Sequence, residues 1–319
     1  MKKKGKGFLN KYSKFEKQKF PFVYLLIAFP VIQFAIFWVY VNFSSIVTAF
    51  IDGENQFTFD NFKLVFDALV NTDSYGFNLF DSLKRTWIIW GVNFFILFPI
   101  SLLTTYILAK KIPGHYVFRI CYIIPSLMGA VLWTRLVRYL VAYNGPVTVA
   151  LLNMGVPLPF NAQQNGLFGG PETGFITIIA IQIIMGLVGN NAVLTGAFTR
   201  VPNEIFESAE LDGAGFWRSF FHVAIPCIWP TIGTLLVFNL CSVMTADYNI
   251  FLYTNGTGGM EMSTVGFLLY KITYEISLSG GQAYYGYPAA LGLFLTLLTL
   301  PIVLIGKKII DNIYKGVTI

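Results

Sequence analysis

Long apolar runs separated by polar segments dominate the sequence. A bilayer core about 30 Å thick is crossed by about 20 mainly apolar helical residues. Six stretches meet this requirement, at about residues 21–46, 86–109, 117–141, 174–198, 225–246 and 288–305. The pattern predicts an all-α integral membrane protein with six transmembrane helices in one domain, residues 21–310, between tails at 1–20 and 311–319.

Composition agrees with a multi-pass membrane protein. Apolar and aromatic residues make up 55% of the 319 residues, and charged residues make up only 12%. Soluble domains carry about 25% charged residues. The composition excludes a disordered chain, a disulfide scaffold and a typical cytosolic enzyme.

Charge distribution sets the expected orientation. Eight of the 22 Lys and Arg residues lie between Lys2 and Lys19. A basic tail can bind nucleic acid, but the apolar run that follows it indicates a membrane segment instead. Six spans put both tails on the side that also holds the basic segments 110–119 and 200–222. Positive residues mark the cytoplasmic side, so we expect both termini to be cytoplasmic.

The sequence offers no catalytic or metal-binding cluster. Its three cysteines form no CxxC pair, and its two histidines, His115 and His222, are isolated from one another. A phosphate-binding GxxxxGK[ST] loop is also absent. We expect no catalytic residues, no metal and no cofactor bound by this chain.

One cytoplasmic segment, residues 199–225, differs from the rest. Pro202 suits a first helical turn, and Glu204 and Glu207 place negative charge near the positive end of a short helix. Gly213 is suited to end that helix and turn the chain into a second one. On physical grounds this segment is either an amphipathic linker on the membrane or a docking element for a cytoplasmic partner.

The same segment carries a motif. Glu207-Ser208-Ala209, Asp212-Gly213-Ala214 and Ala224-Ile225-Pro226 closely resemble the EAA loop of permease subunits in binding-protein-dependent ABC importers. Ser208 replaces the usual Ala and keeps the side chain small. The stretch 285–292 and the basic tail before the first span are similar to the maltose-type first permease of the sugar-importer family.

The resemblance implies a bacterial plasma-membrane subunit that imports a sugar or oligosaccharide and is not itself an enzyme. It implies a second, unlike permease subunit, two cytoplasmic ATPases that bind ATP and Mg, and an extracytoplasmic solute-binding protein. It also implies that the loop couples ATPase closure to helix movement through Glu204, Glu207, Ser208, Ala209, Asp212, Gly213 and Ala214.

Polar residues within the fourth and fifth spans are candidates for a solute path, because polar groups in a membrane usually face a cavity or a helix partner. The residues are Gln182, Met185, Gly186, Gly189 and Asn190 in the fourth span and Asn239, Ser242, Val243 and Ala246 in the fifth. Amides offer donors and acceptors to hydroxyl-rich solutes. The alternative is hydrogen bonding between helices.

Two arginines lie in the third span. Arg138 is near the outer end and is expected to extend toward water. Arg135 lies deeper and needs a partner, for which Asp247 is the candidate. We expect a structural ion pair between them, and if Arg135 instead faced the solute path, an acidic sugar would become the expected substrate.

Other functions stay open from the sequence. An importer of this type could carry a peptide, an amino acid or a polyol phosphate. A self-contained secondary transporter would need an ion-coupling site and repeated halves, and a membrane enzyme would need a polar cluster at depth. Neither feature is visible in the sequence.

Overall fold

The chain is built almost wholly from helices. The computed structural model describes residues 14–72, 78–110, 114–189, 191–255, 262–278 and 285–313. Within these ranges, β pairing is limited to one isolated antiparallel bridge between Ile51 and Phe57. The all-α fold class is confirmed at this level.

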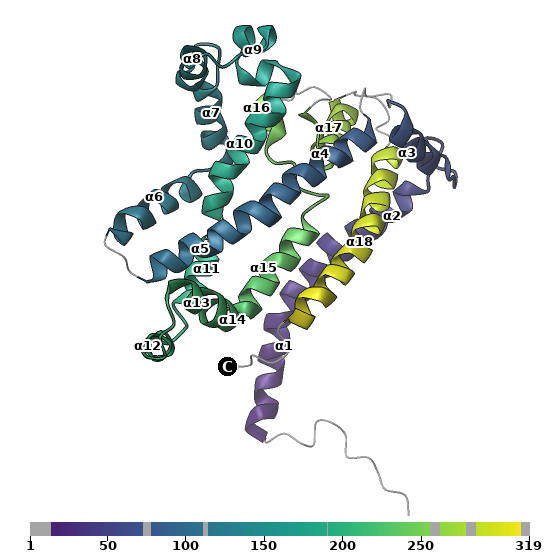
Figure 1. The fold of residues 1–319 in the computed structure, drawn as a ribbon. Helices are drawn as coiled ribbons and strands as arrows, with labels where there is room; N and C mark the ends of the chain where they lie inside the picture. The colour runs from purple at the N-terminus through teal and green to yellow at the C-terminus, as the bar shows by residue number, and fades with distance from the viewer. Residues whose placement is uncertain are drawn as a thin grey trace, which may run out of the picture.

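The first apolar segment is one long helix with a π-helical insertion. Its parts are α1 (Lys14–Phe34), η2 (Ala35–Tyr40) and α2 (Val41–Ala49). The stretch Pro21–Ala49 is long and apolar enough to cross a membrane, and its most apolar part is not buried against the rest of the chain. Its last part, α2, packs on α18 (Gly286–Ile313), beside which it lies in Figure 1.

The second span combines α4 (Leu79–Gly91), η3 (Val92–Leu97) and α5 (Phe98–Ala109). It begins before the predicted position 86 because Asn78 caps it: the Asn78 side chain accepts a hydrogen bond from the backbone N–H of Asp81. Such a cap satisfies an amide that the first helical turn leaves free. The short helix α3 (Asp60–Val70) packs beside this span, against α4 and α18.

The third predicted span is broken. It consists of α6 (His115–Leu127) and α7 (Ala130–Leu140), with extended backbone at Met128 and Gly129 between them. Pro125 lies in the last turn of α6 and lacks the N–H that a continuous helix needs. Three short elements follow it: α8 (Pro146–Asn153), α9 (Phe160–Asn165) and η4 (Leu167–Gly169).

The fourth predicted span coincides with the apolar helical segment Thr173–Phe198, made of α10 (Pro171–Gly189) and α11 (Asn191–Phe198). The loop after it contains α12 (Asn203–Leu211), α13 (Phe216–Ser219), η5 (Phe220–Ala224) and α14 (Ile225–Cys227), and leads into α15 (Trp229–Cys241). The chain then forms α16 (Ile250–Thr254) and α17 (Val265–Leu278) before α18.

The number of spans differs from the sequence prediction. In the part of the chain that the structure describes, four helices are long and apolar enough to cross a membrane. A fifth results if Phe216–Cys227 and Trp229–Cys241 are joined across their 76° bend. Pro226 and Pro230 flank that bend. The third predicted span, at about residues 117–141, is missing from this number because it is divided into the short helices α6 and α7.

Two hydrophobic clusters occupy the two ends of the helix bundle. The first joins α3, α4, α10, α17 and α18 around Phe267, Leu268 and Ile272, which are almost fully buried. It requires a close backbone approach at Gly266, where an added Cβ would lie 2.5 Å from the carbonyl oxygen of Ala246. The second cluster joins α5, α11, η5 and α15 and supports the loop that contains α12.

Candidate functional site

The loop that contains α12 projects from one end of the molecule. In Figure 1 this end also carries the first turns of α1 and the last turns of α18, whereas α8, α9 and α16 gather at the opposite end. The beginning of the first span and the end of the last span therefore lie on the side of α12. The predicted positions of the two tails concern residues that lie mostly outside the described ranges.

The predicted helix, turn and second helix are all present in this loop. Helix α12 begins after Pro202, and its two glutamates, Glu204 and Glu207, are exposed. Ile205 and Phe206 turn inward and pack on the second hydrophobic cluster. One face of α12 is thus fixed to the membrane helices, and the other faces outward.

Gly213 ends α12 in a Schellman motif. The backbone N–H of Ala214 donates to the carbonyl of Ala209 at 2.8 Å, and the N–H of Gly213 donates to the carbonyl of Glu210 at 3.0 Å. This motif places its glycine in the left-handed region, and Gly213 has φ +76°. No other heavy atom lies within 4 Å of the position that a Cβ would take there, so the backbone conformation alone favours glycine.

Tyr106, near the end of α5, is the centre of the support beneath the loop. Its side chain is almost fully buried, and its hydroxyl donates to Ser219 Oγ at 3.0 Å. Four phenylalanine rings contact it: Phe198, Phe206, Phe216 and Phe220. A movement of α12 or α13 must therefore be passed to α5 and α11, because close-packed interiors transmit strain.

An ion pair adds a second connection between α5 and α12. Lys110 Nζ lies 3.0 Å from Glu210 Oε1. Partial burial of Lys110 disfavours its charge, but hydrogen bonds and attraction to Glu210 and Tyr106 outweigh this and raise the pKa of Lys110. The ammonium is therefore charged at neutral pH.

The outer face of the loop combines charge with exposed apolar groups. Glu207, Ser208 and Asp212 are exposed, and Leu211 is 90% exposed beside them. Trp217 on α13 is 57% exposed. The sequence prediction did not include Leu211. This residue could have been found as an apolar residue that lies outside the helical face formed by Ile205 and Ala209. A rigid helix that presents such groups is a suitable docking surface.

The candidate path residues of α10 lie at helix contacts. Gln182 Nε2 donates to the backbone carbonyl of Tyr248 at 3.3 Å, and Met185 packs against a small cluster around Tyr253. At Gly186 an added Cβ would lie 2.5 Å from Leu97 Cδ1, so this glycine permits close packing on the second span. The surroundings of Gly189 are not described, and Asn190 lies outside the described residues.

The candidates after α10 divide into core and polar positions. Val243 is fully buried in the first hydrophobic cluster, and Ala246 supplies the carbonyl that Gly266 approaches. Ser242 is exposed and donates to the backbone carbonyl of Asn239. Asn239 Oδ1 is buried without a hydrogen-bond partner. An unpaired buried acceptor costs about 1–3 kcal/mol, so Asn239 is the path candidate with capacity for a further hydrogen bond.

The expected ion pair between Arg135 and Asp247 is not formed. Ion pairs between described residues join Lys63 to Asp60, Lys110 to Glu210 and Lys271 to Glu275. Asp247 follows the end of α15, where its Oδ1 accepts the backbone N–H of Asn249 at 3.1 Å. Arg135 is exposed and lines a pocket with residues of α16. The expectation was wrong because α15 ends at Cys241 and the following turns give the Asp247 carboxylate a local amide partner.

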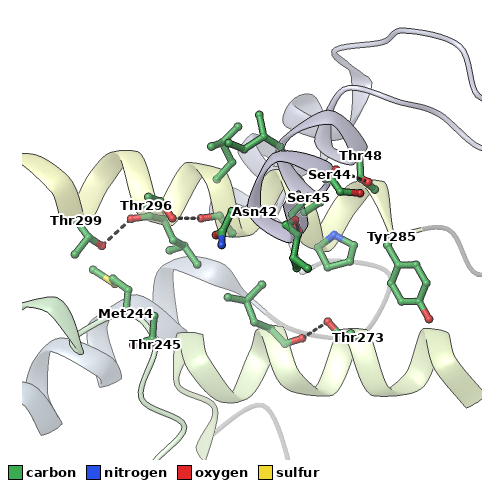
Figure 2. A pocket seen from close by; sticks show the side chains of 18 of the residues that line it. Asn42, Ser44, Ser45, Thr48, Met244, Thr245, Thr273, Tyr285, Thr296 and Thr299 are labelled. Carbon is green, nitrogen blue, oxygen red and sulfur yellow. Dashed lines mark hydrogen bonds between the residues drawn. The ribbon is translucent and has the colours of Figure 1, made fainter. Parts of the chain in front are cut away.

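A cleft of about 820 Å³ lies between α2, α18, α17 and the end of α15. Figure 2 shows that hydroxyl and amide side chains line it. Six of them donate to backbone carbonyls four residues earlier on their own helices: Asn42, Ser45, Thr48, Thr273, Thr296 and Thr299. Since these donors are already used, the walls of the cleft offer mainly acceptors and tolerate contact with lipid.

Within the described ranges, no three His, Cys, Asp or Glu side chains lie close enough together to hold a metal ion.

The chain is similar in sequence to known transport permease proteins. No protein-family model matches the chain. The arabinooligosaccharides transport system permease protein AraP of Bacillus subtilis is 23% identical over 300 residues, which cover 92% of this chain and 89% of that protein. The polygalacturonan/rhamnogalacturonan transport system permease protein YteP of the same organism is 26% identical over 232 residues, covering 71% and 68%.

A solved structure shares the fold. A chain in the crystal structure of a bacterial ABC transporter involved in the import of the acidic polysaccharide alginate has a TM-score of 0.74 and 23% identity, covering 94% of this chain and 98% of that one. The chain thus has the membrane fold of an ABC importer permease, and the resemblance to sugar-importer permeases that its sequence carries is confirmed.

Proposed function

We propose that this chain is a permease subunit of an ATP-driven ABC importer for a sugar or oligosaccharide. It forms half of the translocation path and couples ATPase closure to the movement of the membrane helices. The observation that carries the proposal is α12, which is held on its inner face by the second hydrophobic cluster, ended by Gly213 and exposed along its outer face. Similarity to AraP and YteP supports a saccharide as the solute.

The proposed topology has six spans, with α6 and α7 together forming the third across the break at Met128 and Gly129. Both termini and α12 are cytoplasmic in this topology, in the plasma membrane of a bacterium. The excess of Lys and Arg in the tails and in segments 110–119 and 200–222 supports this orientation.

The chain works with partners in this proposal. A second, unlike permease completes the path, two cytoplasmic ATPases bind ATP and Mg, and an extracytoplasmic protein delivers the solute. A structure of the alginate transporter bound to its periplasmic protein, similar to this chain with a TM-score of 0.74, supports the last of these partners. A peptide or amino acid importer is not favoured, because the similar proteins named above carry saccharides.

Coupling follows from rigid support. When the ATPases close, the force enters at the outer face of α12, around Glu207 and Ser208. Ile205 and Phe206 pass it to the second hydrophobic cluster, which includes Tyr106 and whose members lie on α5, α11, η5 and α15. Asn239 lies on α15, and Gln182 lies on α10, directly before α11. The solute path therefore changes shape when α12 moves these helices.

The test is a tagged purification from native membranes in mild detergent, followed by mass spectrometry. We expect a second multi-span permease and an ATPase with a phosphate-binding loop to copurify with this chain. Recovery of this chain alone, while a control importer stays intact under the same conditions, would exclude the importer and favour a self-contained transporter.

A further inference from the structure

Two arginines lie one helical turn apart on α7, at the end of the molecule opposite α12 (Figure 1). Arg135 and Arg138 share a pocket of about 570 Å³ with Thr134, Tyr139 and Asn255. Thr134 and Val137 form the buried face of α7, and the arginines flank that face. The pocket therefore lies along the contact between α7 and α16.

Among the residues that the structure describes, neither arginine forms an ion pair. None of the side chains that line the pocket is acidic. Asp247, the acid that the sequence paired with Arg135, uses its Oδ1 to accept a local backbone amide. Arg135 is exposed, so its planar guanidinium is available to an anion that arrives from outside.

The second arginine is held in place. The guanidinium of Arg138 donates through Nη1 to the side-chain oxygen of Asn255. Asn255 ends α16 with φ +53°, in the left-handed region that asparagine tolerates better than most residues. Asn255 therefore acts as a positioning residue, which fixes the direction of one guanidinium and leaves its other N–H groups free.

The surrounding side chains suit a carbohydrate. Tyr139 is 72% exposed and offers an aromatic face next to the arginines, and Asn255, whose oxygen accepts from Arg138, keeps its amide NH2 group for a sugar hydroxyl. Aromatic rings give sugar rings a flat apolar surface with a polar edge, and arginine binds carboxylates through two parallel hydrogen bonds. A neutral sugar would leave the positive charge of both guanidinium groups without a counter-ion.

The pocket also lies close to the candidate path. Val137 on α7, Ile181 on α10 and Tyr253 on α16 form one small buried cluster, against which Met185 packs. Solute bound by Arg135 and Arg138 would thus lie near the outer part of α10, the helix that carries Gln182 and Met185.

From this arrangement we infer that Arg135 and Arg138 form an outer subsite for the carboxylate of an acidic, uronate-containing oligosaccharide. This inference rests on the proposed transport function and narrows its substrate class. It commits to a sugar carboxylate rather than a lipid phosphate, because Tyr139 and Asn255 provide ring and hydroxyl contacts that a phosphate does not need.

The test is direct binding to the full chain in nanodiscs of phosphatidylcholine, which lacks anionic headgroups. Trigalacturonate is the probe, and the neutral trisaccharide maltotriose is its control, each followed by saturation-transfer NMR. We expect trigalacturonate to bind and maltotriose to bind at least about tenfold more weakly. Because each hydrogen bond to a charged group contributes about one to two powers of ten in affinity, Arg135→Gln should weaken trigalacturonate binding about ten- to hundredfold.

Two further variants separate recognition from structure. Arg135→Lys keeps the charge but loses the planar guanidinium that donates two parallel hydrogen bonds to a carboxylate. Its affinity for trigalacturonate should therefore lie between those of the parent and Arg135→Gln. Arg119→Gln removes an equally exposed charge from α6, outside the pocket, and should leave binding unchanged. Thermal unfolding of each variant in the same nanodiscs shows whether the protein stays folded.

Three outcomes would overturn the inference. The first is equal binding of trigalacturonate and maltotriose, and the second is an equal loss in Arg119→Gln and Arg135→Gln. The third, seen in a second set of nanodiscs that contain phosphatidylglycerol, is binding of this lipid to the arginines without binding of trigalacturonate. The binding assay contains neither ATPase nor binding protein, so a negative result leaves the copurification test of the importer unaffected. Conversely, failure to copurify an ATPase would refute the importer even if trigalacturonate binds.

Discussion

Replacement of Gly213 by alanine tests the coupling role of α12 most directly. The variant adds a single methyl group at a position with φ +76°, in the Schellman turn that ends α12. The matched control is Gly215→Ala in the same loop. Gly215 has φ −66°, and neither glycine has any other heavy atom within 4 Å of an added Cβ. The two variants therefore differ in the sign of φ and not in crowding.

The structure gives the size of the effect. A left-handed conformation costs an L-residue other than glycine about 1–2 kcal/mol, which is about a 5- to 30-fold change in the equilibrium between the native turn and its alternatives. Gly215→Ala adds no such cost. Since Leu211 and Asp212 are exposed and lie outside the buried clusters, the cost falls on the end of α12 and not on the membrane core.

The assay is solute uptake by cells that carry the complete importer, normalised to the amount of this chain in the membrane. We expect Gly213→Ala to lower uptake several-fold and Gly213→Val, whose branched side chain suits the turn less well, to lower it further. Gly215→Ala should transport at the parent rate, and Gly213→Asn should lose less than Gly213→Ala because asparagine tolerates positive φ.

Equal uptake by Gly213→Ala and Gly215→Ala would refute the reasoning, since the sign of φ would then have no consequence. Loss of Gly213→Ala from the membrane would also contradict it, because the added methyl group meets no neighbouring atom. Copurification of the ATPase with each variant shows whether a loss of uptake arises from weaker docking.

Three further predictions concern the support of the loop and the core. Tyr106→Phe should lower the free energy of unfolding by about 1–3 kcal/mol by leaving the buried Ser219 hydroxyl without its partner, and Ser219→Ala should recover much of this loss in a double-mutant cycle by thermal unfolding. Gly266→Ala should cost about 3 kcal/mol or more, because its Cβ meets backbone 2.5 Å away, whereas Gly292→Ala meets nothing and should be nearly neutral. The raised pKa of Lys110 means that its ion pair contributes fully below the unfolded pKa of about 10.4 and is lost only as the pH rises through the higher folded value. Unfolding of Lys110→Ala should therefore differ from the parent by less than about 1 kcal/mol, equally at pH 6 and pH 9.

The sequence by itself determined the membrane class, the all-helical fold, most of the apolar spans and the turn at Gly213. These features are local. The apolar composition of a 20-residue window decides whether that segment can leave water for a membrane. A glycine near the end of a short helix favours the left-handed conformation that ends the helix, and this preference is also local. The motif from Glu207 to Ala214 could be recognised for the same reason, because its spacing lies within a single loop.

Tertiary structure decided what these elements contact. Val243 and Ala246 share a helical face with Asn239 in the sequence, yet Val243 is buried in the core and Ala246 lies against Gly266. The end of α15 at Cys241 changes the direction of that face, which a periodic pattern cannot foresee. The break at Met128 and Gly129 likewise depends on how α6 and α7 pack, since membrane helices often continue through a proline.

The arginines of α7 give the clearest case. Sequence reasoning could say that a charged group in a membrane span needs a partner, because an isolated charge is costly there. It could not say which group comes near, since the distance between residues 135 and 247 depends on the turns after α15. The structure gives Asp247 a local amide, gives Arg138 the side chain of Asn255, and leaves Arg135 exposed in a pocket without acids. Long-range pairing is set by the packing of whole helices, and only the assembled fold fixes it.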